Sequence, residues 1–277
     1  MGIVGRDNCL DDCAVLPCGD QVMVATTDML HRTTDFVPGM SDWQIGWMSA
    51  AVTISDIASM GAAPAYILIA VGLDDWQHLA GVMQGAQDCC KKFGAAIIGG
   101  DIDHHDELTV VTTGLGLVEN KYLVRRMGAK PGDLVCITGT PGQAQAYLDG
   151  FTGFEKALFE PQPRVAEGQL LGRSGASAMM DDSDGIALSL YDLSSVNNCG
   201  FSIESSKIPR AKGISAEQSR ELALYGGGDY ELIFTLPPAR HPVPGLSYSV
   251  IGTVTAEKQV LVDGQPLEKR GYQHKWE

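Results

Sequence analysis

The chain has 277 residues and a formal net charge of −14, with 44% hydrophobic and 19% charged residues. This length can bury a large core in two domains or one large α/β unit, and so acidic a surface argues against a nucleic-acid partner. Its longest apolar stretch is too short to span a bilayer and its start does not resemble a secretory signal, so we expect a cytoplasmic protein without a membrane partner.

The first half of the chain alternates between strand and helix patterns. Alternating apolar residues predict a first strand, Ser41 can cap a helix that ends near Gly61, and Asp74 or Asp75 can cap a second helix that ends at Gly94. The expected order is therefore β-α-β-α-β-β, over Gln21–Thr27, Ser41–Met60, Tyr66–Val71, Asp74–Gly94, Ala95–Ile98 and Leu108–Val118.

A polar segment from Lys121 to Asp133, with glycine and proline, predicts a connection between two halves. The second half again mixes the two patterns, with strands near Leu134–Thr138, Phe201, Glu231–Thr235 and Tyr248–Val254, and helices near Pro163–Arg173, Gly185–Val196 and Ser215–Leu224. The fold class is therefore α/β with mixed sheets. We expect one domain over residues 1–120, the connection over 121–133 and a second domain over 134–277.

Acidic residues interrupt or end apolar segments at five places, which are Asp11-Asp12, Thr26-Thr27-Asp28, Asp56, Gly99-Gly100-Asp101 and Asp181-Asp182-Ser183-Asp184-Gly185. Ligand sites in α/β folds collect at strand ends, so these acids are expected to converge. Taken singly, Asp12, Asp28 and Asp184 could equally cap turns or a helix. Taken together, hard oxygen ligands without histidine or thiolate indicate Mg²⁺, which commonly bridges carboxylates to nucleotide phosphates.

Asp56 is the most informative of these acids because its helix segment, Ala50 to Ala58, is apolar nearly all round and therefore expected to be buried. A buried carboxylate near a helix C-terminus needs a compensating cation. We expect either a metal ion or a buried ion pair with Arg32 or Lys91.

The sequence contains neither GxxxxGK[ST] nor GxGxxG, so phosphate must be held without a Walker or Rossmann loop. Arg126 is the candidate phosphate ligand because a guanidinium offers a fixed fork to phosphate oxygens. The alternative is a solvated surface arginine beside Arg125. The glycines of Gly226 to Glu231 allow a ligand to approach the backbone closely, or simply form a tight turn.

Several motifs occur together in one order, namely Asp11-Asp12-Cys13-Ala14-Val15, Thr26-Thr27-Asp28-Met29-Leu30, Ser55-Asp56-Ile57-Ala58, Gly99-Gly100-Asp101, Gly128-Ala129-Lys130-Pro131-Gly132-Asp133, Ser183-Asp184-Gly185 and Gly227-Gly228-Asp229-Tyr230-Glu231-Leu232. This order spans nearly the whole chain and resembles the thiamine-monophosphate kinase family. The acidic motifs alone resemble the wider aminoimidazole ribonucleotide synthetase superfamily.

The resemblance implies a two-domain aminoimidazole ribonucleotide synthetase-like fold, a homodimer paired through the N-terminal halves, and ATP with several Mg²⁺ ions near the domain junction. Thiamine monophosphate would accept the γ-phosphoryl group by direct in-line transfer, with Asp28, Asp56 and Arg126 carrying catalysis. The implied metal ligands are Asp12, Thr26, Thr27, Asp28, Asp56, Asp101, Asp181 and Asp184. The implied nucleotide contacts are Gly100, Asp101, Arg126 and Ser183, and the implied substrate contacts are Asp35, Asp229, Tyr272 and Trp276.

Two positions depart from the family pattern. Gly228 stands where many members have a glutamate, and Leu10 replaces the usual glycine before the Asp-Asp pair. Two other functions are compatible with the sequence: an enzyme of the same superfamily that activates an amide oxygen with ATP, and a nucleotide-binding homologue without turnover.

Overall fold

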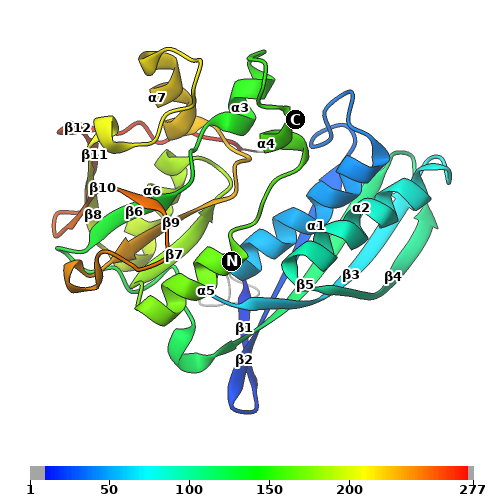
Figure 1. Cartoon of the computed structure of the whole chain (residues 1–277), viewed down its shortest axis with the longest axis horizontal. Coiled ribbons are helices and arrows are strands. Elements are labelled where there is room, and N and C mark those ends of the chain that lie inside the picture. Colours follow the sequence, from blue (N-terminus) through cyan, green and yellow to red (C-terminus); the bar gives the residue numbers. More distant parts are fainter. Residues whose placement is uncertain (1–9, 274–277) are drawn as a thin grey trace.

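The computed structural model describes residues 10–273, and all statements about the structure refer to them. Within this range the strands form a five-stranded and a seven-stranded sheet, which occupy the two halves of the molecule (Figure 1). None of the described helices combines the length and apolar character that crossing a membrane requires.

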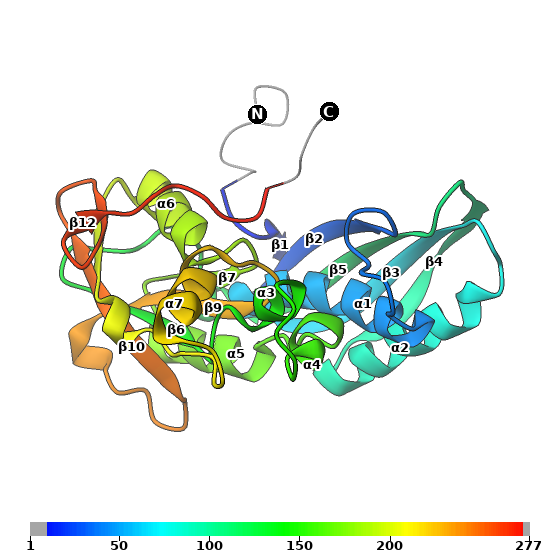
Figure 2. The same cartoon turned by 90° about the horizontal axis from the view of Figure 1, so that it is seen from above.

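The five-stranded sheet has the order β1-β2-β5-β3-β4, in which only β3 and β4 are parallel. Its strands are β1 (Ala14–Cys18), β2 (Gln21–His31), β3 (Ala63–Leu73), β4 (Ala96–His104) and β5 (Thr109–Glu119). Helices α1 (Asp42–Ser59) and α2 (His78–Phe93) cover one face of this sheet, and Figure 2 shows no helix on the other face.

The N-termini of α1 and α2 test the two predicted helix caps. Ser41 caps α1 as predicted: its hydroxyl accepts from the Gln44 backbone N–H, and the Gln44 side chain accepts from the Ser41 N–H. The predicted cap of α2 was wrong. The helix begins at His78 without a side-chain cap, because Asp74 pairs with Arg32 and Asp75 accepts a hydrogen bond from the Gln77 N–H.

The seven-stranded sheet has the order β12-β11-β8-β10-β6-β9-β7. Its strands are β6 (Leu134–Thr138), β7 (Ala178–Asp182), β8 (Gly200–Ile203), β9 (Glu231–Leu236), β10 (Tyr248–Thr255), β11 (Val260–Val262) and β12 (Gln265–Pro266). The helices of this half are α3 (Gln143–Leu148), α4 (Glu155–Phe159), α5 (Val165–Ser174), α6 (Ile186–Asn197) and α7 (Ala216–Tyr225). Short 3₁₀ helices are η2 (Asn120–Tyr122), η3 (Ser205–Lys207) and η4 (Pro238–Arg240).

Both faces of the second sheet are buried. Val135 and Ile137 of β6 pack toward α6, whereas the intervening Cys136 joins the cluster that contains Leu171 of α5. This alternation follows from the two-residue period of a strand. Helix α1 also contacts β7 and α5, so it packs against both halves of the molecule.

The predicted order of the first half is confirmed, with β1 as an additional edge strand. The predicted strands and helices of the second half are confirmed with small shifts of their ends. The elements β7, β11, β12, α3 and α4 were missed because each is only two to six residues long, too short to show a period.

Helices α1 and α2 approach each other so closely that each uses a glycine at the contact. A Cβ on Gly46 would lie 1.8 Å from the carbonyl oxygen of Val82, and a Cβ on Gly85 would lie 1.8 Å from that of Trp43. Neither contact can be relieved by a side-chain rotation, because both partners are backbone atoms.

We expect Gly85→Ala to lower the free energy of unfolding by about 1–3 kcal/mol, because the added methyl group must push the two helices apart. Urea unfolding followed by circular dichroism measures the change. Gln84→Ala, at an exposed position of the same helix, should change stability by less than about 0.5 kcal/mol. A Gly85→Ala protein as stable as the parent would contradict the close packing.

Candidate active site

Three carboxylates from distant parts of the sequence meet at the junction of the two halves. Oxygen atoms of Asp12, Asp56 and Asp181 all lie within 4.8 Å of one another. Asp12 precedes β1, Asp56 lies in α1 and Asp181 lies near the end of β7. The predicted convergence of these acids is therefore what the structure shows.

A hydroxyl group donates a hydrogen bond to each of these three carboxylates and to Asp28, whose charge acts on Asp56 and Asp181. The pairs are Thr26 to Asp56 at 2.6 Å, Thr53 to Asp28 at 2.6 Å, Ser55 to Asp181 at 2.8 Å and Ser59 to Asp12 at 2.6 Å. Sequence reasoning missed the three donors on α1. The available signal was the presence of Thr53, Ser55 and Ser59 in a helix that is otherwise almost wholly apolar and buried.

The site concentrates more negative charge than its surroundings can solvate. Burial, with repulsion from Asp12, raises the pKa of Asp181 to about 8. Burial and the neighbouring carboxylates also raise the pKa of Asp56 and the pKa of Asp28. Without a cation, these groups therefore tend to retain protons that exposed carboxyls would lose.

Arg126 supplies the positive charge that contacts this site. Its guanidinium donates to Asp12 from Nε at 2.9 Å and also from a terminal nitrogen, and it lies 3.7 Å from Asp192. The side chain is only 22% exposed, so the alternative of a solvated surface arginine was wrong. The alternative pairing of Arg32 with Asp56 was also wrong, because Arg32 pairs with Asp74.

The donor atoms available at this site fit Mg²⁺. Asp12, Asp56 and Asp181 offer hard carboxylate oxygens close to one another, and Asp28 lines the cleft beside Asp56 and Asp181. Among the described residues, no cysteine or histidine joins the three clustered carboxylates. One guanidinium cannot neutralise four carboxylates, so the arrangement has room for divalent charge.

A cleft of about 300 Å³ opens from this site. Asp28, Asp56 and Asp181 line its charged end. The remaining walls carry polar and aromatic residues from both halves, including Asp35, Ser183, Asp184, Tyr230 and Tyr272. A ligand in this cleft can therefore place an organic ring away from the carboxylate site. It can also place an anionic group near that site when cations offset the repulsion.

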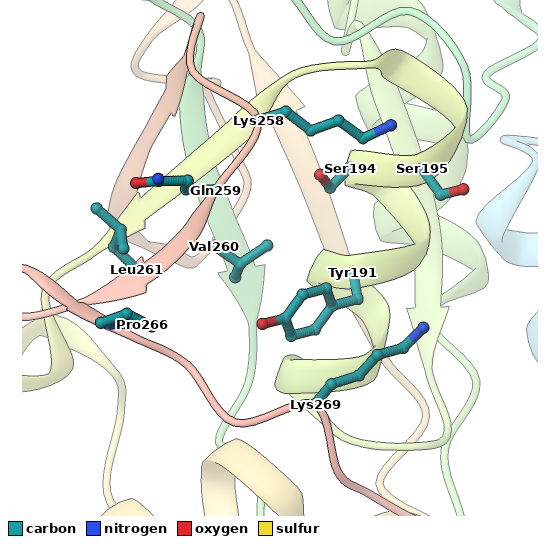
Figure 3. Close-up of a pocket in the computed structure, with 9 residues that line it drawn as sticks. All are labelled: Tyr191, Ser194, Ser195, Lys258, Gln259, Val260, Leu261, Pro266 and Lys269. Atoms are coloured by element: carbon teal, nitrogen blue, oxygen red, sulfur yellow. The ribbon is translucent and has the colours of Figure 1, made fainter.

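A second cavity of about 430 Å³ lies between α6 and β11 (Figure 3). Figure 3 shows the side chain of Lys258 extended toward Ser194 and Ser195, and that of Lys269 beside Tyr191. No carboxylate is present among the described residues that line it. Because this cavity lacks the carboxylate ligands that the acidic cleft offers, the acidic cleft is the candidate site.

Comparison with known proteins places this site in a family. Residues 10–118 match the family model described as AIR synthase related protein, N-terminal domain. A thiamine-monophosphate kinase of Methanospirillum hungatei is 49% identical over 276 residues, covering 99% of this chain and 96% of the relative. The chain belongs to the thiamine-monophosphate kinase family.

Two further proteins agree with this membership. The thiamine-monophosphate kinase of Halobacterium salinarum is 40% identical over 287 residues, covering 99% of this chain and 96% of that protein. A solved structure described as AaThiL complexed with AMPPCP and TMP superposes with a TM-score of 0.91 at 26% identity, covering 99% of this chain and 94% of that one. The predicted aminoimidazole ribonucleotide synthetase-like fold is thereby confirmed.

Three residues that the family resemblance assigned to metal or nucleotide do not join the carboxylate site within this chain. Thr27 points to the sheet face opposite Thr26 and Asp28, where its hydroxyl contacts Thr113 at 3.0 Å. Gly100 and Asp101 lie on the exposed edge strand β4, with β5 and β3 between them and β2. The described part of this chain therefore does not bring these three residues to the cleft.

The residues assigned to substrate are also divided. Asp35, Tyr272 and the neighbouring Asp184 line the cleft. Asp229 does not: its carboxylate accepts hydrogen bonds from the backbone N–H groups of Gly142, Gln143 and Ala144, at 2.6, 2.9 and 2.9 Å. In the thiamine-monophosphate kinase fold of this chain, Asp229 therefore holds the start of α3. Trp276 lies outside the described residues.

The raised pKa of Asp181 predicts a pH-dependent stability in the absence of divalent metal. An unfolded Asp titrates near 3.8 and the folded one near 8, so the folded state binds the extra proton between these values. The free energy of unfolding should therefore fall as pH rises from about 4 to 8, by at most about 1.4 kcal/mol per pH unit for this group.

Urea titrations in EDTA across this range measure the slope. Asp181→Asn should flatten it, whereas Asp20→Asn at an exposed turn should leave it unchanged. Identical slopes for Asp181→Asn and the parent protein would show that Asp181 titrates as an ordinary carboxyl.

Proposed function

We propose that this chain is a thiamine-monophosphate kinase that transfers the γ-phosphoryl group of ATP to thiamine monophosphate, giving thiamine diphosphate and ADP. The observation that carries the proposal is the cleft, which joins a carboxylate site suited to metal-nucleotide phosphates to a ring-sized space. Family membership supports the same reaction, as does the likeness to a structure complexed with AMPPCP and TMP. We also propose that the reaction takes place in the cytoplasm, where ATP is available.

We assign the binding of Mg²⁺ to Asp12, Asp28, Asp56 and Asp181, with Asp184 at the exposed rim of the cleft. Bound Mg²⁺ would screen the negative charge of the two phosphate chains and stabilise the transferred group. The hydroxyls of Thr26, Thr53, Ser55 and Ser59 fix the carboxylates in place. Arg126 orients Asp12, and we assign it and Ser183 to contact the nucleotide phosphates.

The chemistry requires alignment rather than a general base. The acceptor is a phosphate monoester, whose oxygens are already nucleophilic at neutral pH, so no side chain has to remove a proton from it. The protein must hold two anions in line against their mutual repulsion. Away from the carboxylate site, the carboxylate of Asp35 and the ring of Tyr272 suit the cationic thiazolium of thiamine.

We further propose that the protein is a homodimer formed through the helix-free face of the first sheet. Tyr66 and Leu68 on this face are 45% and 40% exposed. Leu115 of β5, which pairs with Tyr66, is partly exposed on the same face. A second copy would bury this apolar surface. Thr27 and Asp101 lie on the same face. If they bind nucleotide or metal as proposed, they would do so at the interface between the two copies. The pairing domain is residues 1–120, followed by the connection at 121–133 and the second domain at 134–277.

The function is tested by ADP release from Mg-ATP with and without thiamine monophosphate, followed by identification of the product. We expect ADP formation to depend on thiamine monophosphate. The amount of ADP should equal the amount of thiamine diphosphate formed. Asp56→Asn should lower kcat by more than about 100-fold, because it removes a carboxylate from the metal site. Asp20→Asn should retain parental turnover.

Free phosphate released in place of thiamine diphosphate would instead favour an amide-activating enzyme of the same superfamily. ATP binding without ADP formation on any acceptor would favour a homologue that has lost turnover. Parental kcat in Asp56→Asn would contradict the assignment of the metal site.

The dimer is tested by Leu68→Glu, which places a charge in the centre of the proposed interface. We expect the dissociation constant of the dimer to rise by at least about 30-fold, while the far-ultraviolet circular dichroism stays native. Sedimentation velocity over a range of concentrations measures the mass. Lys212→Asp, on an exposed loop of the second half, should leave the dimer intact, and a monomeric parent protein would end the proposal.

A further inference from the structure

Helix α3 packs directly against the glycine turn at residues 226–228. A Cβ on Gly226 would lie 2.6 Å from the Cβ of Gln145, and a Cβ on Gly228 would lie 3.3 Å from the Cβ of Ala144. Gly228 also has a φ of +89°, which disfavours any side chain there. The turn therefore presents a bare backbone to the cleft, and Gln145 is the polar side chain that stands beside it.

Gln145 lines the cleft and is half-buried. Its Nε2 donates one hydrogen bond to the exposed Asp149, at 2.8 Å, which leaves Oε1 and the second N–H of the amide for other partners. Among the described residues that line the cleft, Gln145 carries the one side-chain amide. It can therefore donate and accept in the same plane, which a carboxylate cannot do.

The helix backbone that carries Gln145 is held in place by buried contacts. Asp229 accepts three backbone hydrogen bonds at the first turn of α3, and Ala144 and Ala146 are buried. Leu148 and Leu158 line the cleft next to Gln145 and provide apolar contact for a flat ring. A polar edge beside an apolar wall is the arrangement that binds a heterocycle in one orientation.

The aminopyrimidine of thiamine has a matching edge. Its exocyclic amino group is a donor and the adjacent ring nitrogen is an acceptor, and a Gln amide pairs with this pattern through two hydrogen bonds, as it does with adenine. We propose that Gln145 determines the specificity for the aminopyrimidine ring, its Oε1 accepting from the amino group and its Nε2 donating to the ring nitrogen. This inference rests on the proposed function, since it identifies how the acceptor of that reaction is recognised.

The test is binding of thiamine monophosphate and of oxythiamine monophosphate, in which an oxo group replaces the amino group, measured by calorimetry with Mg²⁺ and AMPPCP present. The parent protein should bind thiamine monophosphate more tightly. Gln145→Ala should weaken that binding by about 10- to 100-fold and bring the ratio of the two dissociation constants close to one. Gln145→Glu, which keeps the shape but loses the donor, should weaken binding as well.

Matched controls lie on and beside the same helix. Gln143→Ala removes an amide that donates to the Thr140 carbonyl and lines a different cavity, so it should leave both constants unchanged. Asp149→Ala removes the internal partner of Gln145 but keeps its amide, and should leave the ratio intact.

The proposal is overturned if Gln145→Ala binds thiamine monophosphate as the parent does, or if both ligands weaken equally, which would indicate a structural role alone. It is equally overturned if the parent protein does not discriminate between the two ligands. The kinase reaction is judged separately by ADP formation. Discrimination that depends on Gln145 without turnover would support this contact and reject the kinase.

Discussion

The repulsion among carboxylates in a confined, poorly solvated space is the constraint on which the rest of this structure depends. Oxygen atoms of Asp12, Asp56 and Asp181 lie within 4.8 Å of one another. Hydroxyl donors, one guanidinium and the raised pKa of Asp181 reduce the cost of this arrangement without removing it. The residual negative charge favours the binding of cations at this site.

Helix α1 contributes to the carboxylate site and also packs against both halves of the molecule. It carries Asp56 and three of the hydroxyl donors, covers the first sheet, and contacts β7 and α5 of the second half. Its close contact with α2 through Gly46 and Gly85 leaves little freedom to shift. A site assembled from both halves is thus positioned by one rigid element, which is the condition for aligning two anionic phosphates.

The cleft separates two tasks in space. In the proposed reaction its carboxylate end would bind the phosphate groups, and its other end, formed by α3, the glycine turn and the segment that carries Tyr272, would bind the organic part of the substrate. The helix-free face of the first sheet adds a third region, on which Thr27 and Asp101 lie away from the cleft. A single chain therefore contains the carboxylate site in one place and other residues of the family pattern in another.

The sequence by itself determined the order of the larger elements and the motif acids, because strand and helix periods and clustered aspartates are local features. Ser41 and the acids at residues 28, 56 and 181 were identified in this way. Only the tertiary structure decided which side chains meet. Thr26 and Thr27 are neighbours in sequence yet face opposite sides of β2, and Asp229 holds α3 although its motif resembled a substrate contact. The pairing of Thr53, Ser55 and Ser59 with their carboxylates, and the place of Gln145 beside the glycine turn, depend on distances between segments far apart in the chain, which no local pattern contains.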